Sequence, residues 1–305
     1  MRLLLARQPI EEVRTAPDTP ERVREQLALV ERARDFAAEL GLEVGKRYTS
    51  YVAWPGDRIV TTVVAARPGE VEPAGFHFPI VGKVPYKGFF DQQAAENEAE
   101  SLREQGYDVC LVAVSAYSTL GWMDDPVTAP MLQRDDARLV ETLLHELVHA
   151  TVFVPSQPEF NEGVARFIGQ EAMARFYGDR ASRTRVSEDR RVAAETLAFR
   201  ERVAVLYERS PPAGDARVER GALERDFRAR LAELPLTSRD ARELARRARL
   251  NDACLALNGT YALDDARHER LLENLDGDLV RFIERLRAAA ERENPRSHFF
   301  GTAQP

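Results

Sequence analysis

The alternation of apolar and polar positions changes about halfway along the chain. Before residue 130, segments with apolar residues at helical spacing alternate with short runs rich in β-branched residues. Past residue 160, apolar residues recur almost wholly at helical spacing, with Arg and Glu on the polar faces and one break at residues 210–215. This order predicts an α+β fold, in which a small mixed or antiparallel sheet precedes a helix-rich C-terminal half.

Capping residues and turn signals place the elements of the N-terminal half. Proline after a threonine cap starts one helix and glycine ends it, while Asp91 caps a second helix. β-Branched runs on both sides of a Pro-Gly-Asp sequence predict a hairpin. The predicted elements are a helix over 19–41, hairpin strands over 49–54 and 58–66, an edge strand or ordered loop over 76–90, a helix over 92–105 and a buried strand over 109–117.

Composition and charge narrow the class of protein. The chain has 305 residues, of which 44% are apolar and 30% charged, as in ordinary globular proteins. The formal charge is −7, and Lys and Arg are interleaved with Asp and Glu, so nucleic acid is not expected as the main partner. No stretch approaches the roughly 20 apolar residues that cross a bilayer. We therefore predict a soluble protein without a transmembrane segment.

The two cysteines lie far apart in the sequence. Cys110 falls in an apolar run and Cys254 in a predicted helix. We interpret both as small core residues and predict no disulfide framework.

The helix around residues 138–152 is apolar on nearly all sides. At 100° per residue, its polar side chains fall in one narrow stripe: Arg138, Thr142, His145, Glu146 and His149. One interpretation is that this stripe is simply the solvent face of a half-buried helix. The other follows from the apolar flanks, which predict burial, where polar side chains need partners.

The spacing of the histidines suits a metal ion. Residues four apart lie on one helix face, so His145 and His149 can reach the same ion, while Glu146 can contact a water beside it as general base. Two prolines then end the helix, and Glu162 is expected in the first turn of a second helix capped by Asn161. Glu162 is therefore the candidate third ligand.

Small residues flank Glu162 on its helix face: Ala165, Gly169 and Ala172. They would let the two helices approach closely enough for the carboxylate to reach the ion. The alternative is ordinary packing, with Glu162 favourable near the positive end of the helix dipole.

Several segments together resemble a known family. HELVHATVFV, PEFNEGVARFIG, FPIVGKVPYKGFFD and VSAYSTLGWMDDPV resemble the bacterial putative aminopeptidases, zinc peptidases of the gluzincin kind. The resemblance covers most of the chain. It implies a zincin-like metallopeptidase fold, one Zn²⁺ per chain bound by His145, His149 and Glu162, and Glu146 as the catalytic base.

The order of the elements predicts an organisation of the chain, and the resemblance raises the question of its location. We expect a single metallopeptidase unit over 1–305, with an α/β part at 1–130, zinc-binding helices at 131–178 and a helical part at 179–305. Members of the family commonly begin with an export or lipoprotein signal, and this chain starts where such a leader would end. A cytoplasmic location and a periplasmic or cell-envelope location both remain open.

The expected activity is zinc-dependent hydrolysis of peptide bonds, by an aminopeptidase acting on a peptide substrate. Tyr117 and Tyr261 are candidate donors to the developing oxyanion, and the segment 114–122 is a candidate strand for pairing with substrate. The acid that would bind the substrate amine is left open. Two alternatives are a catalytically inactive zincin-fold binding protein and a zinc hydrolase acting on a non-peptide substrate. The sequence leaves the oligomeric state open.

Overall fold

The computed structural model describes residues 6–78, 82–115, 124–209 and 214–301. Within these ranges the chain is helix-rich with small sheets, which confirms the predicted α+β class. No described helix has the length and apolar character needed to cross a membrane.

The chain forms two compact units, each made of discontinuous segments. The first comprises Met1–Val60, Ala113–Gly178 and Asp264–Pro305, and the second comprises Thr61–Val112 and Asp179–Leu263. The expectation of a single metallopeptidase unit with three sequential parts stays a prediction, because compactness alone does not test a functional division.

The first unit contains a small sheet and most of the helices discussed below. Its strands are β1 (Gln8–Pro9), β2 (Ser50–Val52) and β8 (Val127–Thr128), in the order β1-β2-β8. Its helices are α2 (Ile10–Thr15), α3 (Glu21–Glu39), α5 (Ala129–Leu132), α6 (Asp136–Thr151), α7 (Pro158–Tyr177), α12 (Asp265–Asn274), α13 (Leu279–Ala290) and α14 (Pro295–Phe300). Helix α3 confirms the first predicted helix, although Pro20 rather than Thr19 is its N-cap.

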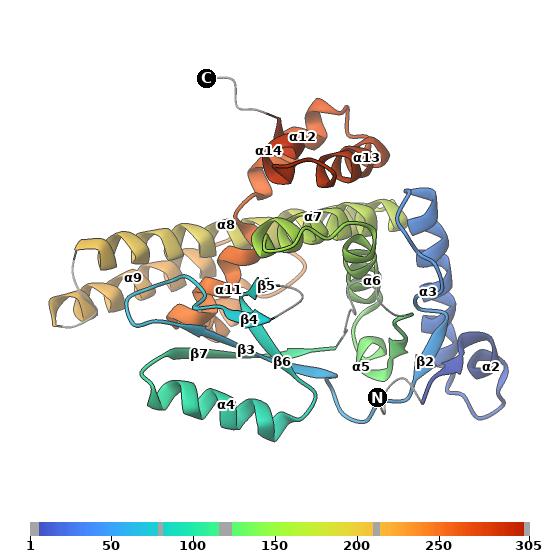
Figure 1. Ribbon diagram of the computed structural model, residues 1–305, viewed down its shortest axis with the longest axis horizontal. Helices are drawn as coiled ribbons and strands as arrows, with labels where there is room; N and C mark the ends of the chain where they lie inside the picture. The colour runs from blue at the N-terminus through green and yellow to red at the C-terminus, as the bar shows by residue number, and fades with distance from the viewer. Residues whose placement is uncertain (1–5, 79–81, 116–123, 210–213, 302–305) are drawn as a thin grey trace. The chain divides into compact units, whose positions relative to one another are not determined.

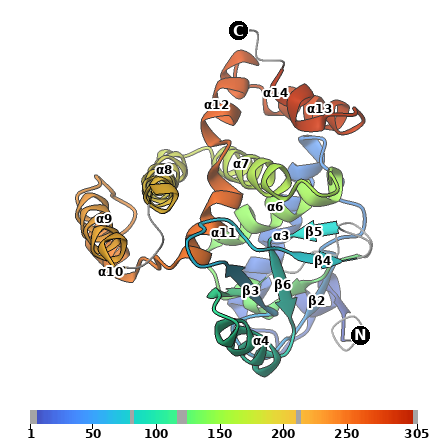
Figure 2. The same cartoon turned by 60° about the vertical axis from the view of Figure 1, so that its left-hand side comes forward.

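Helices α6 and α7 form the centre of this unit (Figure 1). Leu143, Leu144 and Leu147 of α6 are fully buried, as the apolar pattern of this helix predicts. On α7, Phe160 and Phe167 contact Phe299 and Phe282 at ring-centroid distances of 5.6 and 5.3 Å. These aromatic contacts anchor α7 against α13 and α14, so α7 is held in a packed core. Figure 2 shows the ribbons of α13 and α14 above that of α7.

The second unit contains a separate sheet covered by helices. Its sheet has the order β6-β3-β7, and a further hairpin is formed by β4 and β5. The strands are β3 (Val60–Ala66), β4 (Phe76–Phe78), β5 (Gly82–Val84), β6 (Tyr86–Phe89) and β7 (Asp108–Val114), and the helices are α4 (Gln92–Glu104), α8 (Arg180–Arg209), α9 (Asp215–Ala232), α10 (Ala241–Arg247) and α11 (Asp252–Ala262). Asp91 caps α4 as predicted, accepting a hydrogen bond from the Ala94 backbone N–H at 2.8 Å.

The predicted hairpin over 49–66 is wrong. Both strands exist, but β2 pairs with β1 and β8, whereas β3 pairs with β6 and β7. Gly56 adopts a φ of 91°, so the turn signal is real, yet the chain that follows joins another sheet. β3 is buried along its whole length and needs a partner on each side, which outweighs the local preference for a hairpin.

Strand β7 differs from the predicted buried strand. It lies at one edge of its sheet and is only partly buried, and the outer residues of the predicted element, 116 and 117, fall outside the described residues. Its outward carbonyls are covered by side chains that precede and cap α11: Arg249 donates to Leu111 O at 2.7 Å and Asn251 to Val109 O at 2.8 Å. This edge is therefore protected from further strand pairing over these residues.

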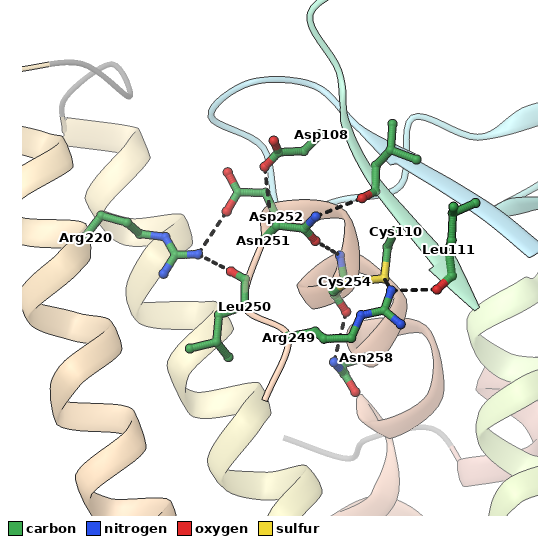
Figure 3. The surroundings of a disulfide bond; sticks show 11 residues. Asp108, Cys110, Leu111, Arg220, Arg249, Leu250, Asn251, Asp252, Cys254 and Asn258 are labelled. Atoms are coloured by element: carbon green, nitrogen blue, oxygen red, sulfur yellow. Dashed lines mark hydrogen bonds and ion pairs between the residues drawn. A yellow bond between two sulfur atoms is a disulfide. The ribbon is translucent and has the colours of Figure 1, made fainter. Parts of the chain in front are cut away.

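The prediction that no disulfide links the cysteines is also wrong. Cys110 of β7 and Cys254 of α11 form a disulfide, with their Cα atoms 5.2 Å apart (Figure 3). Both residues are buried, as predicted, among apolar neighbours of the same unit. The bond links positions 144 residues apart, a separation from which pairing cannot be read in the sequence.

Candidate metal centre

Helix α6 carries the two histidines on a face that is largely buried. Asp135 caps the helix by accepting a hydrogen bond from the Arg138 N–H at 2.9 Å, and the last helical residue is Thr151. His149 is only 5% exposed, and His145 and Glu146 are half-buried. The interpretation of the polar stripe as a solvent face is therefore wrong for His149.

Helix α7 begins earlier than predicted. Its first residue is Pro158 and its N-cap is Gln157, so Asn161 lies inside the helix and is not its cap. Glu162 accordingly falls in the second turn. Residues 152–157 connect the two helices, and α7 packs against α6 after this short connection.

The structure brings His145, His149 and Glu162 together. The two Nε2 atoms are 3.1 Å apart, and Glu162 Oε2 lies 3.4 Å from His145 Nε2 and 3.5 Å from His149 Nε2. Donors bound tetrahedrally to one ion at about 2.0–2.1 Å would be separated by about 3.3–3.4 Å. Two imidazoles and one carboxylate with this spacing fit a metal ion, and they form the potential metal-binding group among the described residues.

Burial and neighbouring charges act in opposite directions on the pKa values of Glu162 and His149. Burial acts to raise the pKa of Glu162, but the two imidazoles outweigh it and hold that pKa well below its ordinary range. For His149, burial acts to lower the pKa, and the Glu162 carboxylate, with a smaller contribution from Glu146, raises it overall. The site thus favours an ionised carboxylate and a positive charge beside it.

A glycine sets the distance between the two helices at this site. A Cβ atom added to Gly169 would lie 3.1 Å from Glu141 O and 3.2 Å from both the backbone N and the Cβ of His145. This confirms the expectation that a small residue of α7 allows close approach beside Glu162. His149 Nδ1 has no hydrogen-bond partner among the described residues, so helix packing, more than a second hydrogen bond, positions this ring.

Tyr48 is a neighbour of Glu146 that the sequence did not reveal. Its side chain is 1% exposed, and its pKa is raised well above the ordinary value by burial and then by the charges of Glu146 and Asp125. Its backbone has a φ of 58°, unusual for a large side chain, and its N–H donates to Asp125 O at 2.7 Å. Nothing in the local sequence signals this conformation.

The structure does not support either tyrosine candidate at the triad. Tyr117, like most of the segment expected to pair with substrate, lies outside the described residues. Tyr261 lies in helix α11 and belongs to the second unit. Glu146 follows His145 on α6 and is half-buried, as a group beside the ion would be.

Comparison with known proteins identifies the family. The sequence matches the family described as "Putative aminopeptidase" over residues 1–299. No curated protein and no solved structure matches the chain. Because the match covers all but the last few residues, the chain belongs to the putative aminopeptidase family.

Proposed function

We propose that this protein is a zinc-dependent aminopeptidase, a zincin-like enzyme of the gluzincin kind. The observation that supports this most is the convergence of His145, His149 and Glu162, with Glu146 next to the first histidine on the same helix. The family to which the chain belongs is named for peptidase activity.

The donor set favours zinc. In this proposal one Zn²⁺ per chain is bound by His145, His149 and Glu162, and three protein ligands leave a fourth position for water or substrate. Bound zinc would polarise the scissile carbonyl and lower the pKa of water to about 7. A structural zinc site would instead be closed by a fourth protein ligand, and the described residues offer only these three at the centre.

Glu146 is assigned the role of general base. It follows His145 by one residue, so it is rotated about 100° from it on the helix and lies beside the ligand positions without competing for them. Its carboxylate would accept a proton from the attacking water and pass it to the leaving amine. Tyr117 and Tyr261 remain predicted oxyanion donors, and no described residue is assigned to the substrate amine.

Metal content tests the ligands. Purified protein should hold one zinc per chain, and His149→Ala should lose it. A wild-type protein without zinc, or a His149→Ala variant with unchanged zinc, would contradict the metal assignment. Glu146→Gln should keep the metal and lose most hydrolysis, since replacing a general base typically costs about 10²–10⁴-fold in rate.

A peptide panel tests the substrate class. Free and N-blocked peptides should be compared with and without a chelator. An aminopeptidase cleaves only the free peptides, and only with metal present. Equal cleavage of blocked peptides would reject the exopeptidase assignment and keep the zinc peptidase.

We also infer that the protein folds in an oxidising compartment, which favours the cell envelope over the cytoplasm. The support is the Cys110–Cys254 disulfide, because such bonds form and persist in oxidising surroundings and are rare in the cytoplasm. The denatured, unreduced protein purified from its native source should contain no free thiol. Two free thiols per chain would contradict this location.

A further inference from the structure

We propose that Asn161 is a positioning residue for the metal site, and that it fixes Glu162 by locking the turn that joins helices α6 and α7. This inference rests on the proposed metal site and assigns a task to a residue outside the ligand set. It does not require Asn161 to touch metal or substrate.

The contacts of Asn161 are directed at a single residue. Its Oδ1 accepts a hydrogen bond from the Val154 backbone N–H at 2.9 Å, and its Nδ2 donates to the Val154 carbonyl at 2.7 Å. Asn161 is 4% exposed and Val154 is 6% exposed, so these bonds are shielded from water. Val154 O receives one further, longer bond from Gln157 N at 3.4 Å.

The turn between α6 and α7 needs hydrogen bonds that hold its conformation. Only residues 152–157 separate the two helices, and Ser156 within them has a φ of 60°, a conformation that non-glycine residues rarely adopt. Without the Asn161 side chain, the N–H and the carbonyl of Val154 would stay buried and lose their shortest hydrogen bonds. This loss would lower the stability of the fold. The two bonds therefore fix the start of α7 relative to the end of α6.

Asn161 directly precedes the candidate ligand Glu162, so its bonds to Val154 also affect the position of that carboxylate. Glu162 is the next residue, and its Oε2 must stay between two imidazoles of the other helix. A shift of the first turns of α7 would carry the carboxylate with it. Asparagine suits the task because its short amide offers a donor and an acceptor together, whereas aspartate accepts only and alanine does neither.

The experiment compares Asn161→Ala and Asn161→Asp with a matched control, Thr151→Val. Thr151 also fixes a backbone group near the end of α6, since its Oγ1 accepts from the Glu43 N–H at 2.8 Å, but it does not bond the turn or α7. Zinc affinity is measured by competition with a chelator, and Co²⁺ absorption reports the ligand geometry. Thermal unfolding of the metal-free proteins measures the stability lost in each.

We expect both Asn161 variants to bind zinc about 10- to 100-fold more weakly, as supporting residues of metal sites do. Their Co²⁺ spectra should change, and the Thr151→Val spectrum and zinc affinity should match those of wild type. If the Asn161 variants lose stability but keep wild-type affinity and spectrum, Asn161 is merely structural and the proposal is wrong.

Crystal structures of metal-free wild type and Asn161→Ala separate this inference from the proposed function. A wild-type protein that binds no metal would defeat the proposed function alone. Displacement of Glu162 Oε2 from the two imidazoles in Asn161→Ala would still support the positioning role, and an unmoved carboxylate would overturn it.

Discussion

Replacing Gly169 by alanine tests how closely α7 must approach the histidine helix. Two of the three atoms nearest to the new Cβ, Glu141 O and His145 N, are backbone, at 3.1 and 3.2 Å. Backbone cannot rotate away as a flexible side chain can, so the helices must move apart. Overpacking of this kind costs about 1–3 kcal/mol.

Helix propensity acts in the opposite direction. Alanine is favoured over glycine in a helix interior by about 0.8–1.0 kcal/mol. Gly169→Ala should therefore change the free energy of unfolding by between about 0 and 2 kcal/mol in the destabilising direction. Because the contact is made by His145 itself, zinc affinity should also fall, by about tenfold for a loss of about 1.4 kcal/mol in binding.

Gly221→Ala is the control. Gly221 lies inside α9, and the nearest atom to an added Cβ is the end of the Arg225 side chain at 3.5 Å, an ordinary contact. This variant should be stabilised by helix propensity and bind zinc as wild type does. The assays are thermal unfolding of the metal-free proteins and zinc competition titration. A Gly169→Ala protein as stable as Gly221→Ala, with wild-type zinc affinity, would refute the close-approach argument.

Three further predictions concern stability. Burial acts to raise the Glu188 pKa, but hydrogen bonds from residues 237–238 outweigh it and lower that pKa to about 2, so its stabilisation is complete above about pH 4.5 and lost as the pH falls towards 2. Glu188→Gln should lower the free energy of unfolding at neutral pH and flatten this pH dependence in pH-resolved unfolding, whereas an unchanged pH profile would contradict the assignment. Replacing Cys110 and Cys254 together by alanine should cost about 2–5 kcal/mol in unfolding experiments, and a reductant should then have no further effect. A chelator should remove about 2.7 kcal/mol of stability from protein held at a hundredfold zinc excess over Kd, and His149→Ala should show no such change in calorimetry.

The histidine helix could be predicted because its chemistry is local. His145, Glu146 and His149 lie within one helix, where a period of 3.6 residues fixes their relative directions whatever surrounds them. Glu162 was within reach of the same reasoning, since proline ends the first helix and small residues permit a close second one. The convergence of the three candidate ligands follows from these local rules once α7 packs on α6.

The role of Asn161 could not be predicted, because the residue suits two tasks. Asparagine before a helical segment is a frequent N-cap. The sequence does not show that α7 begins at Pro158, three residues before Asn161. Only the folded turn reveals that the amide bonds to Val154. The sequence correctly predicts that the Asn161 side chain accepts a hydrogen bond from a backbone N–H. The donor is Val154, in the turn, and not a residue in the first turn of the helix.

The partners of the strands and of the cysteines could not be predicted from the sequence, for a different reason. The hairpin over 49–66 satisfied every local signal, yet β2 and β3 joined separate sheets, because strand partners are chosen by burial of whole faces. The cysteine pairing depends likewise on α11 docking onto β7 through Arg249 and Asn251, contacts that span about half the chain. Periodicity describes one element at a time and does not encode its neighbours.

The proposed metal site depends on two different constraints on one helix. Gly169 determines how far α7 lies from His145, and Asn161 determines where α7 starts relative to the end of α6. Distance and register are independent coordinates of a helix pair, so neither residue can compensate for loss of the other. Glu162 lies between these two points along α7, seven residues before Gly169 and directly after Asn161. Its carboxylate therefore meets both imidazoles only when both constraints hold, which explains how two helices joined by a short turn can present three donors at the spacing that a single ion requires.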